Sequence, residues 1–257
     1  MKIYKQIIFF FVFFFLSIYC YTQGNLFSKV INGVYDNIGV TNIISRPNKN
    51  FYLLGNNDPF VNDAIFIKMD SLGNPLLAKK FFTAFSSIPS NILINKAILT
   101  TDSGIFVIGL LPITINNTNF SRAFYAKLDL DGNILWHHTL YNSDNNIPLN
   151  FIINDGIQTK DSGFVIVGSY LQNASIIKTD SLGNVLWAKQ YATENYVSRG
   201  TNIFELSDGS FMFSGIYMLY PSDTKIFISH ISYQGEILWS YQYTNNSSAS
   251  CYYYYCN

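Results

Sequence analysis

Beyond the first forty positions, the hydrophobic residues occur in short runs of about five to nine, rich in β-branched and aromatic side chains and separated by small polar turns. Runs of this length, bounded by Gly, Asn, Asp and Ser, are typical of β-strands. No segment has the convincing period of an amphipathic helix. The pattern predicts an all-β chain with strands at residues 42–46, 51–55, 64–69, 75–82, 94–100, 105–110, 122–128, 134–140, 151–159, 164–170, 174–179, 185–191, 202–206, 211–217, 225–231 and 236–243.

Two turn motifs alternate along these runs. The first has the form Lys-x-Asp-x-x-Gly-Asn in three copies, which contain Gly73, Gly132 and Gly183, and a degenerate fourth copy contains Gly235. The second is Asp-Ser-Gly before a hydrophobic run and a further Gly, with variant forms in the first and last copies. In both motifs Asp or Ser caps the turn, and Gly or Asn accepts a positive φ. Each motif therefore predicts a hairpin.

Self-similarity at a period of about fifty residues indicates a repeat architecture with four antiparallel strands in each unit. We therefore predict a β-propeller of four four-stranded blades within residues 23–243, with the blades at about 42–82, 94–140, 151–191 and 202–243. The variable stretches fall between the second and third strands and between blades. Because loops carry binding in such scaffolds, these stretches are where we expect a ligand site.

A large aromatic residue follows three of the four motif glycines at a spacing of four. These residues are Trp136, Trp187 and Trp239, and Leu77 takes their place in the first blade. Large aromatics at equivalent repeat positions are what the packing of neighbouring blades requires. We expect a structural role for them, not a binding role.

The repeat register leaves one segment unassigned. Residues 26–31 align with the fourth strand of a blade whose first three strands are absent. Two interpretations stay open: an incomplete propeller that lacks downstream blades, or a four-bladed ring with an extra N-terminal strand. The irregular tail 244–257 resembles no part of the repeat.

The N-terminus has the pattern of a secretory signal. Lys2 and Lys5 precede an apolar run at 7–16, and a short polar exit follows. We predict a signal peptide at 1–22, cleaved to leave Gln23 first and no membrane span. Lipidation of Cys20 is the alternative. The expected location is secreted, periplasmic or at the cell surface.

Two cysteines remain after that cleavage. Cys251 and Cys256 lie close together near the C-terminus, and an exported chain meets an oxidising compartment. They are candidates for a small disulfide loop, but they cannot staple the whole domain. The fold must depend on its hydrophobic core.

Charge excludes one class of partner. Only 12% of residues are charged and the formal net charge is zero, so there is no basic stripe for a nucleic-acid backbone. The oxygens of Asp129 and Asp131 are closely spaced, but the glycine and glutamate positions of a calcium-binding EF-hand are not matched. We expect a turn there, and a local ion pair between each repeated Lys and the Asp of its own turn.

No recognisable catalytic constellation is present. His137 and His138 are adjacent and point to opposite faces of a strand, so they cannot jointly bind one metal ion. His230 stands alone, and no nucleophile-elbow motif occurs. We assign no catalytic, cofactor-binding or metal-binding residue from the sequence.

The alternating motifs resemble secreted propeller-repeat proteins of Bacteroidetes bacteria, which often carry a sorting domain for type IX secretion. No such domain follows the repeats in this chain. The Gly-to-Trp spacing is more loosely similar to quinoprotein-like propellers and to the outer-membrane assembly lipoprotein, where it docks adjacent blades.

The resemblance implies an extracellular or cell-surface protein. Intact repeats without a catalytic set favour a non-enzymatic propeller that binds an unknown protein or glycan. The alternatives are a fragment of a larger propeller enzyme, either glycan-degrading or quinoprotein-like, and a scaffold for envelope assembly.

Overall fold

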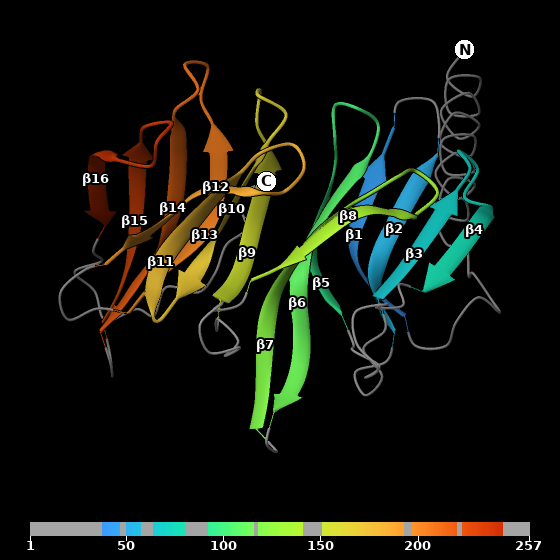
Figure 1. Ribbon diagram of the computed structural model, residues 1–257, viewed down its shortest axis with the longest axis horizontal. Helices are drawn as coiled ribbons and strands as arrows, with labels where there is room; N and C mark the ends of the chain where they lie inside the picture. Colours follow the sequence, from blue (N-terminus) through green and yellow to red (C-terminus); the bar gives the residue numbers. More distant parts are fainter. Residues whose placement is uncertain are drawn as a thin grey trace, which may run out of the picture. The chain divides into compact units, whose positions relative to one another are not determined.

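The computed structural model describes residues 38–46, 50–57, 64–80, 92–115, 118–140, 151–192, 197–219 and 223–243. They form sixteen strands in four antiparallel sheets (Figure 1). The first sheet contains β1 (Ile38–Ser45), β2 (Phe51–Asn57), β3 (Ala64–Met69) and β4 (Pro75–Lys80). The second contains β5 (Leu93–Leu99), β6 (Ile105–Ile115), β7 (Thr118–Leu128) and β8 (Ile134–Thr139).

The third sheet contains β9 (Phe151–Gln158), β10 (Phe164–Tyr170), β11 (Asn173–Thr179) and β12 (Val185–Tyr191). The fourth contains β13 (Val197–Glu205), β14 (Phe211–Leu219), β15 (Asp223–Ile231) and β16 (Ile237–Tyr243). In every sheet the spatial order of the strands is their order in the chain. The described residues contain no helix. The predicted β-propeller with four four-stranded blades is confirmed.

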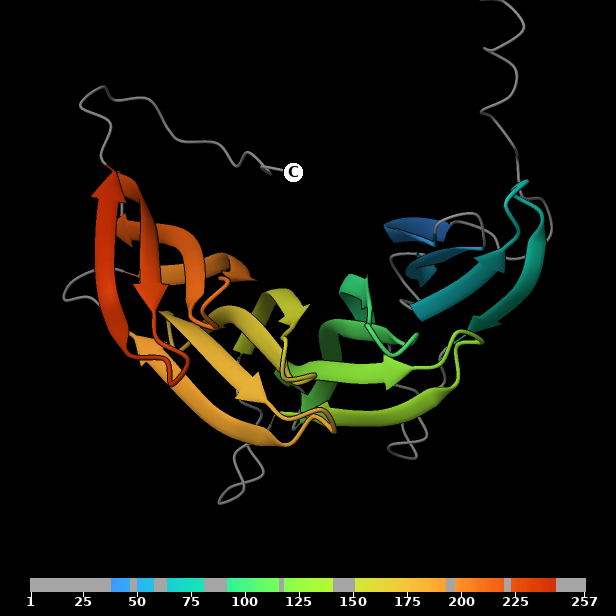
Figure 2. The same ribbon diagram turned by 90° about the horizontal axis from the view of Figure 1, so that it is seen from above.

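Each blade packs against the first strand of the blade that follows it in the chain. Strands β1 and β2 contact β5, strands β5, β6 and β7 contact β9, and strands β9, β10 and β11 contact β13. Figure 2 shows the blades following one another in chain order. The contact between the second and third blades includes stacked rings of Phe106 and Phe164, 4.0 Å between centroids. The core therefore lies between blades, as expected for stacked repeats that cannot bury a sheet face alone.

The glycine that ends the second motif has a packing reason. A Cβ on Gly168 would lie 1.9 Å from the carbonyl oxygen of Ile152 on the neighbouring first strand. The strand pairing shifts register at this point, because Asn154 is an extra residue in a β-bulge. Equivalent close approaches occur at Gly55, Gly109 and Gly215. The repeated glycine thus lets each second strand lie against a bulged first strand.

Several predictions concern residues outside the described part of the chain. These are the signal peptide at 1–22, the lipidation alternative at Cys20, the leading strand 26–31, the tail 244–257 and the disulfide between Cys251 and Cys256. They stay predictions. Across the described ranges, no apolar helix reaches the length needed to cross a bilayer.

Candidate functional site

The first motif forms the same hydrogen-bonded turn in three of its four copies. In the copy at Asp180, one carboxylate oxygen accepts the N–H groups of Leu182 and Asn184 at 2.9 and 2.8 Å. The other oxygen accepts the Asn184 side chain at 2.8 Å. The hydrogen bond from the Asn184 side chain, with those from the two N–H groups, lowers the pKa of Asp180. The carboxylate therefore stabilises the turn.

The closely spaced carboxylates of Asp129 and Asp131 also bind other groups of the chain. Asp129 binds its own turn through Asp131 N–H and Asn133, at 2.7 to 2.9 Å. The side chain of Asp131 instead pairs with Lys68 of the preceding blade at 2.7 Å. Among the residues that the structure describes, no group of three or more metal-ligating side chains comes together. The oxygens of Asp129 stabilise its own turn, and the carboxylate of Asp131 links two blades.

The second motif surrounds a buried lysine. The side chain of Lys178 is fully buried, and its ammonium donates to Asp161 at 2.8 and 3.1 Å. It also donates to the Thr159 hydroxyl at 3.1 Å and to the Thr179 carbonyl at 3.0 Å. Tyr233 of the next blade donates to Asp161 at 2.8 Å. The buried charge is therefore fully hydrogen bonded, as its desolvation requires.

Burial acts to raise the pKa of Asp161, but hydrogen bonds from Lys178, Thr159 and Tyr233 outweigh it and hold this pKa well below the ordinary carboxyl value. The second blade repeats the cluster, where Lys127 pairs with Asp102. The repeated lysines thus form ion pairs as predicted, but their partners differ from those predicted. Lys127 and Lys178 reach the turn that joins the first two strands of their own blade, because each lysine pairs in the sheet with a residue near the start of the second strand.

The last blade replaces this cluster with a Ser and a His. The Ser210 hydroxyl lies 2.7 Å from His230 Nε2 and donates to Asp208. In a catalytic triad the acid accepts a hydrogen bond from the imidazole nitrogen that faces away from the serine, whereas Asp208 contacts the serine itself. Ser210 is also buried. His230 stands where the other blades have lysine, so we interpret the trio as the structural counterpart of the Lys178 cluster.

A polar row along the first strands was missed by the sequence reasoning. Asp155 pairs with Lys96 of the preceding blade and accepts the Ile203 N–H of the following blade at 3.0 Å. The bulged residues Asn95 and Asn154 each donate to a backbone carbonyl of the next blade, at 2.7 and 2.6 Å. The only sequence signal was a polar residue inside a hydrophobic run, and Asn is common throughout this chain.

The motif glycines sit over side chains of the preceding blade. A Cβ on Gly183 would lie 2.7 Å from the Trp136 ring, and one on Gly235 would lie 2.9 Å from the Trp187 ring. Gly132 lies over Phe66 in the same way. Each glycine therefore allows a turn to seat on an aromatic ring of its neighbour.

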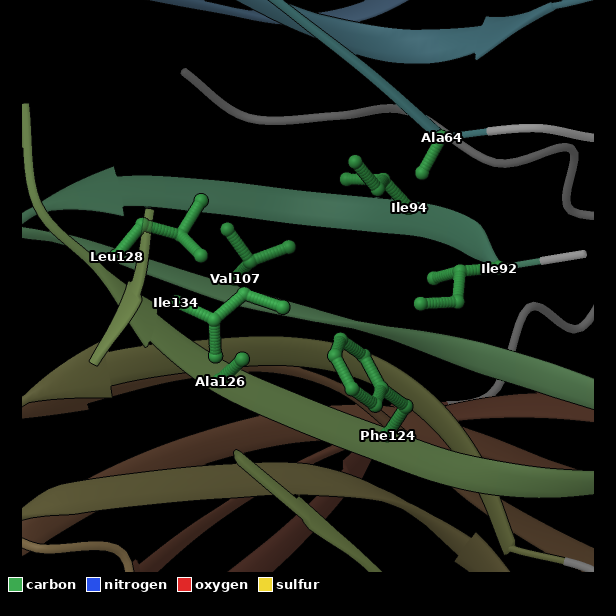
Figure 3. A pocket seen from close by; sticks show the side chains of 8 residues that line it. All are labelled: Ala64, Ile92, Ile94, Val107, Phe124, Ala126, Leu128 and Ile134. Atoms are coloured by element: carbon green, nitrogen blue, oxygen red, sulfur yellow. The ribbon is translucent and has the colours of Figure 1, made fainter. Parts of the chain in front are cut away.

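A small cavity lies between the first two blades (Figure 3). Its volume of about 10 Å³ is near the minimum for a single water molecule, and its lining offers no polar partner. It is therefore a packing defect of the core and not a ligand site. The lining residues are Ala64, Ile92, Ile94, Val107, Phe124, Ala126, Leu128 and Ile134.

No family model and no curated protein matches this sequence. Among solved structures, the chain is similar to a subtype N10 neuraminidase-like protein of A/little yellow-shouldered bat/Guatemala/060/2010, at 12% identity and a TM-score of 0.47, covering 77% of this chain and 64% of that one. It is similar to the GH32 β-fructofuranosidase of Bombyx mori at 14% identity and a TM-score of 0.45, covering 80% and 49%.

A member of the DUF4221 family from Bacteroides vulgatus is similar at 14% identity and a TM-score of 0.44, covering 77% of this chain and 64% of that one. The chain thus spans between about half and two thirds of the length of these three structures.

Proposed function

We propose that this chain is an exported, non-enzymatic β-propeller that binds a protein or a glycan through the ribbon formed by the paired ends of β6 and β7. The export part of the proposal rests on the signal-like N-terminus and on the resemblance to secreted repeat proteins. The non-enzymatic part rests on what the acidic groups contact. In the described structure, the carboxylates that bond to turns or to lysines are those of Asp102, Asp129, Asp155, Asp161 and Asp180.

The observation that carries the proposal is the length of the second hairpin in the second blade. Strand β5 pairs with β6 as far as Leu110, and strand β8 pairs with β7 as far as Phe124. Strands β6 and β7 continue to pair with each other from there to Ile115 and Thr118. Figure 1 shows this two-stranded ribbon running on past the rest of its sheet.

Such a ribbon suits binding for two reasons. Its outer backbone groups have no strand partner among the described residues, so a peptide strand can add to an edge. Its sequence between 111 and 122 is also rich in Asn, Thr and Ser with one Phe, and has Arg122 as its single charge. Amide and hydroxyl groups supply adaptable hydrogen bonds, and an aromatic ring supplies a stacking surface.

The test is a chain in which an Asn-Gly turn replaces residues 112–121. A matched control replaces the two-residue turn of Leu171 and Gln172 with Asn-Gly, which leaves strand lengths unchanged. Purified full-length chains are applied to an array of defined bacterial and host glycans and to a display library of extended peptides. We expect the shortened ribbon to lose at least tenfold in affinity for any ligand of the native chain, while the control keeps it. Equal binding by both variants would refute the assignment to the ribbon.

A further inference from the structure

Strand β16 is the most exposed of the four strands that end a blade. All seven of its residues are exposed, whereas β4, β8 and β12 each contain residues that are partly or fully buried. Trp239 is 38% exposed, Tyr241 is 61% exposed and Tyr243 is 58% exposed. Three exposed aromatic residues on one strand are unusual for a protein surface and indicate an interface.

The same strand is an open edge of its sheet. The strand order in the last blade is β13, β14, β15 and β16, so β16 pairs with β15 on one side and with no described strand on the other. Figure 1 shows β16 at the end of this sheet. The backbone N–H and C=O groups that point away from the sheet at such an edge can pair with a further strand.

Strand β16 lacks the charged residues that usually protect an edge. Proteins place Lys or Pro on edge strands, which prevents pairing with another chain. Strand β4 carries Lys79 and Lys80, β8 carries two histidines, and β12 carries Lys189. Strand β16 reads Ile-Leu-Trp-Ser-Tyr-Gln-Tyr and has no charged residue and no Pro. A second uncharged strand can therefore pair with it without bringing an unpaired charge into the contact.

A β-bulge limits the part of β16 that is suited to pairing. The pairing of β16 with β15 skips Leu238, which is the extra residue of the bulge. Bulges hinder the addition of a strand at an edge. From Trp239 to Tyr243 the pairing with β15 is regular. The part of the edge that can accept a further strand is therefore residues 239–243.

We propose that residues 239–243 pair antiparallel with the same residues of a second copy of this chain. Two identical strands that pair in this way are related by a two-fold axis, which passes through one residue position. With the axis at Tyr241, this residue lies opposite its own counterpart. Trp239 then lies opposite Tyr243 of the second copy, and the two polar residues of the segment lie opposite each other.

This register is what favours a second copy as the partner. Side chains alternate between the two faces of a strand, so the three aromatic residues share one face and Ser240 and Gln242 share the other. The register therefore sets aromatic against aromatic and polar against polar residues, which are cross-strand pairs that stabilise a sheet. Because both copies use the same surface, the contact closes at two copies.

The test measures the mass of the purified full-length chain by light scattering across a range of concentrations. We expect the mass to rise with concentration to twice that of one chain. In Tyr241→Lys two ammonium groups would face each other at the axis, so this variant is expected to have the mass of one chain. Leu182→Lys is the control, because Leu182 is 62% exposed in a turn of the third blade and adds the same charge away from β16. The control is expected to keep the mass of two chains.

A charge exchange tests the position of the axis. Tyr241→Glu is also expected to have the mass of one chain, because two carboxylates would face each other. An equimolar mixture of Tyr241→Lys and Tyr241→Glu at low ionic strength sets opposite charges together and is expected to regain the twofold mass. This recovery would also show that both variants fold. A mixture that keeps the mass of one chain would overturn the pairing through Tyr241.

Hydrogen exchange separates the pairing of edges from a contact between faces. In the proposed pair, the N–H groups of β16 that point away from β15 bond to the second copy. We therefore expect them to exchange about tenfold more slowly in the native chain than in Tyr241→Lys. A twofold mass without this protection would overturn the proposal in favour of a contact between the aromatic faces. A native chain with the mass of one copy at every concentration would overturn it as well.

Discussion

Because the ammonium of Lys178 is buried, we expect that removing its partner Asp161 destabilises the fold more than removing Asp102, the equivalent residue of the second blade. In Asp161→Ala the ammonium loses both contacts to the Asp161 carboxylate and its counter-charge, and keeps Thr159 and Thr179. Removing one partner of a buried pair costs about 3–5 kcal/mol. Because the Asp161 side chain is 37% exposed and partly screened, we expect about 2–3 kcal/mol here.

The matched control is Asp102→Ala. Asp102 holds the equivalent position, but its side chain is 56% exposed and the paired Lys127 is not fully buried, so we expect about 1 kcal/mol. The assay is urea unfolding of the purified chains, which gives the difference in free energy of unfolding. Adding Lys178→Met to Asp161→Ala removes the uncompensated charge and is expected to restore most of the loss. An equal or larger loss from Asp102→Ala, or no recovery in the double variant, would refute the reasoning.

The same pair predicts a pH dependence. Although burial acts to raise it, hydrogen bonds lower the pKa of Asp161 in the folded chain below its unfolded value of 3.8, so the stabilisation is fully present above that value. It is lost as the pH falls from there through the folded pKa, because protonation then accompanies unfolding. Native chain and Asp161→Asn should therefore differ most in unfolding free energy at neutral pH and converge on acidification. A difference that stays constant with pH would contradict this origin.

Two further predictions concern residues with positive φ. Leu171 and Gln172 form a two-residue hairpin turn at φ of +47° and +67°, where Asn-Gly is preferred, so replacing both should stabilise the chain by about 1–2 kcal/mol in thermal unfolding. An unchanged or lower melting temperature would show that their side chains contribute more than the strain costs. Gly183→Ala should destabilise by about 1–3 kcal/mol more than Gly209→Ala, because only the first Cβ meets neighbouring rings. Equal losses in urea unfolding would mean that backbone strain alone accounts for both.

Most of the fold could be predicted from the sequence because hairpin chemistry is local. The Asp carboxylate of the first motif reaches only to N–H groups two and four residues later, so residue types at fixed spacing suffice to specify the turn. Four alternations of two such turns then fixed the number of strands and blades. The ribbon of β6 and β7 was predicted too short, since Pro112 interrupts β6 and the polar run at 118–122 of β7 lacks the hydrophobic pattern of a buried strand.

The contacts between elements depend on packing, and the sequence did not specify them. Lys127 was expected to pair with the Asp of its own turn, but the sheet brings Asp102 closer, and Lys68 reaches across to the next blade. The trio around Ser210 was not foreseen either, because Asp208 and Ser210 come from a turn and His230 comes from strand β15, twenty residues further along the chain. Such partners are set by how hairpins lie against each other, which no spacing along the chain records.

The sequence by itself determined the four-bladed β-propeller, because strand periodicity and turn chemistry act within a few residues. Only the tertiary structure decided which copies of a motif are covered. Trp187 and Trp239 hold the same position of the repeat, yet the turn at Gly235 contacts the first and no turn of the described chain contacts the second. Their difference arises from the neighbouring blade, since burial depends on what packs against a residue and not on the residue itself.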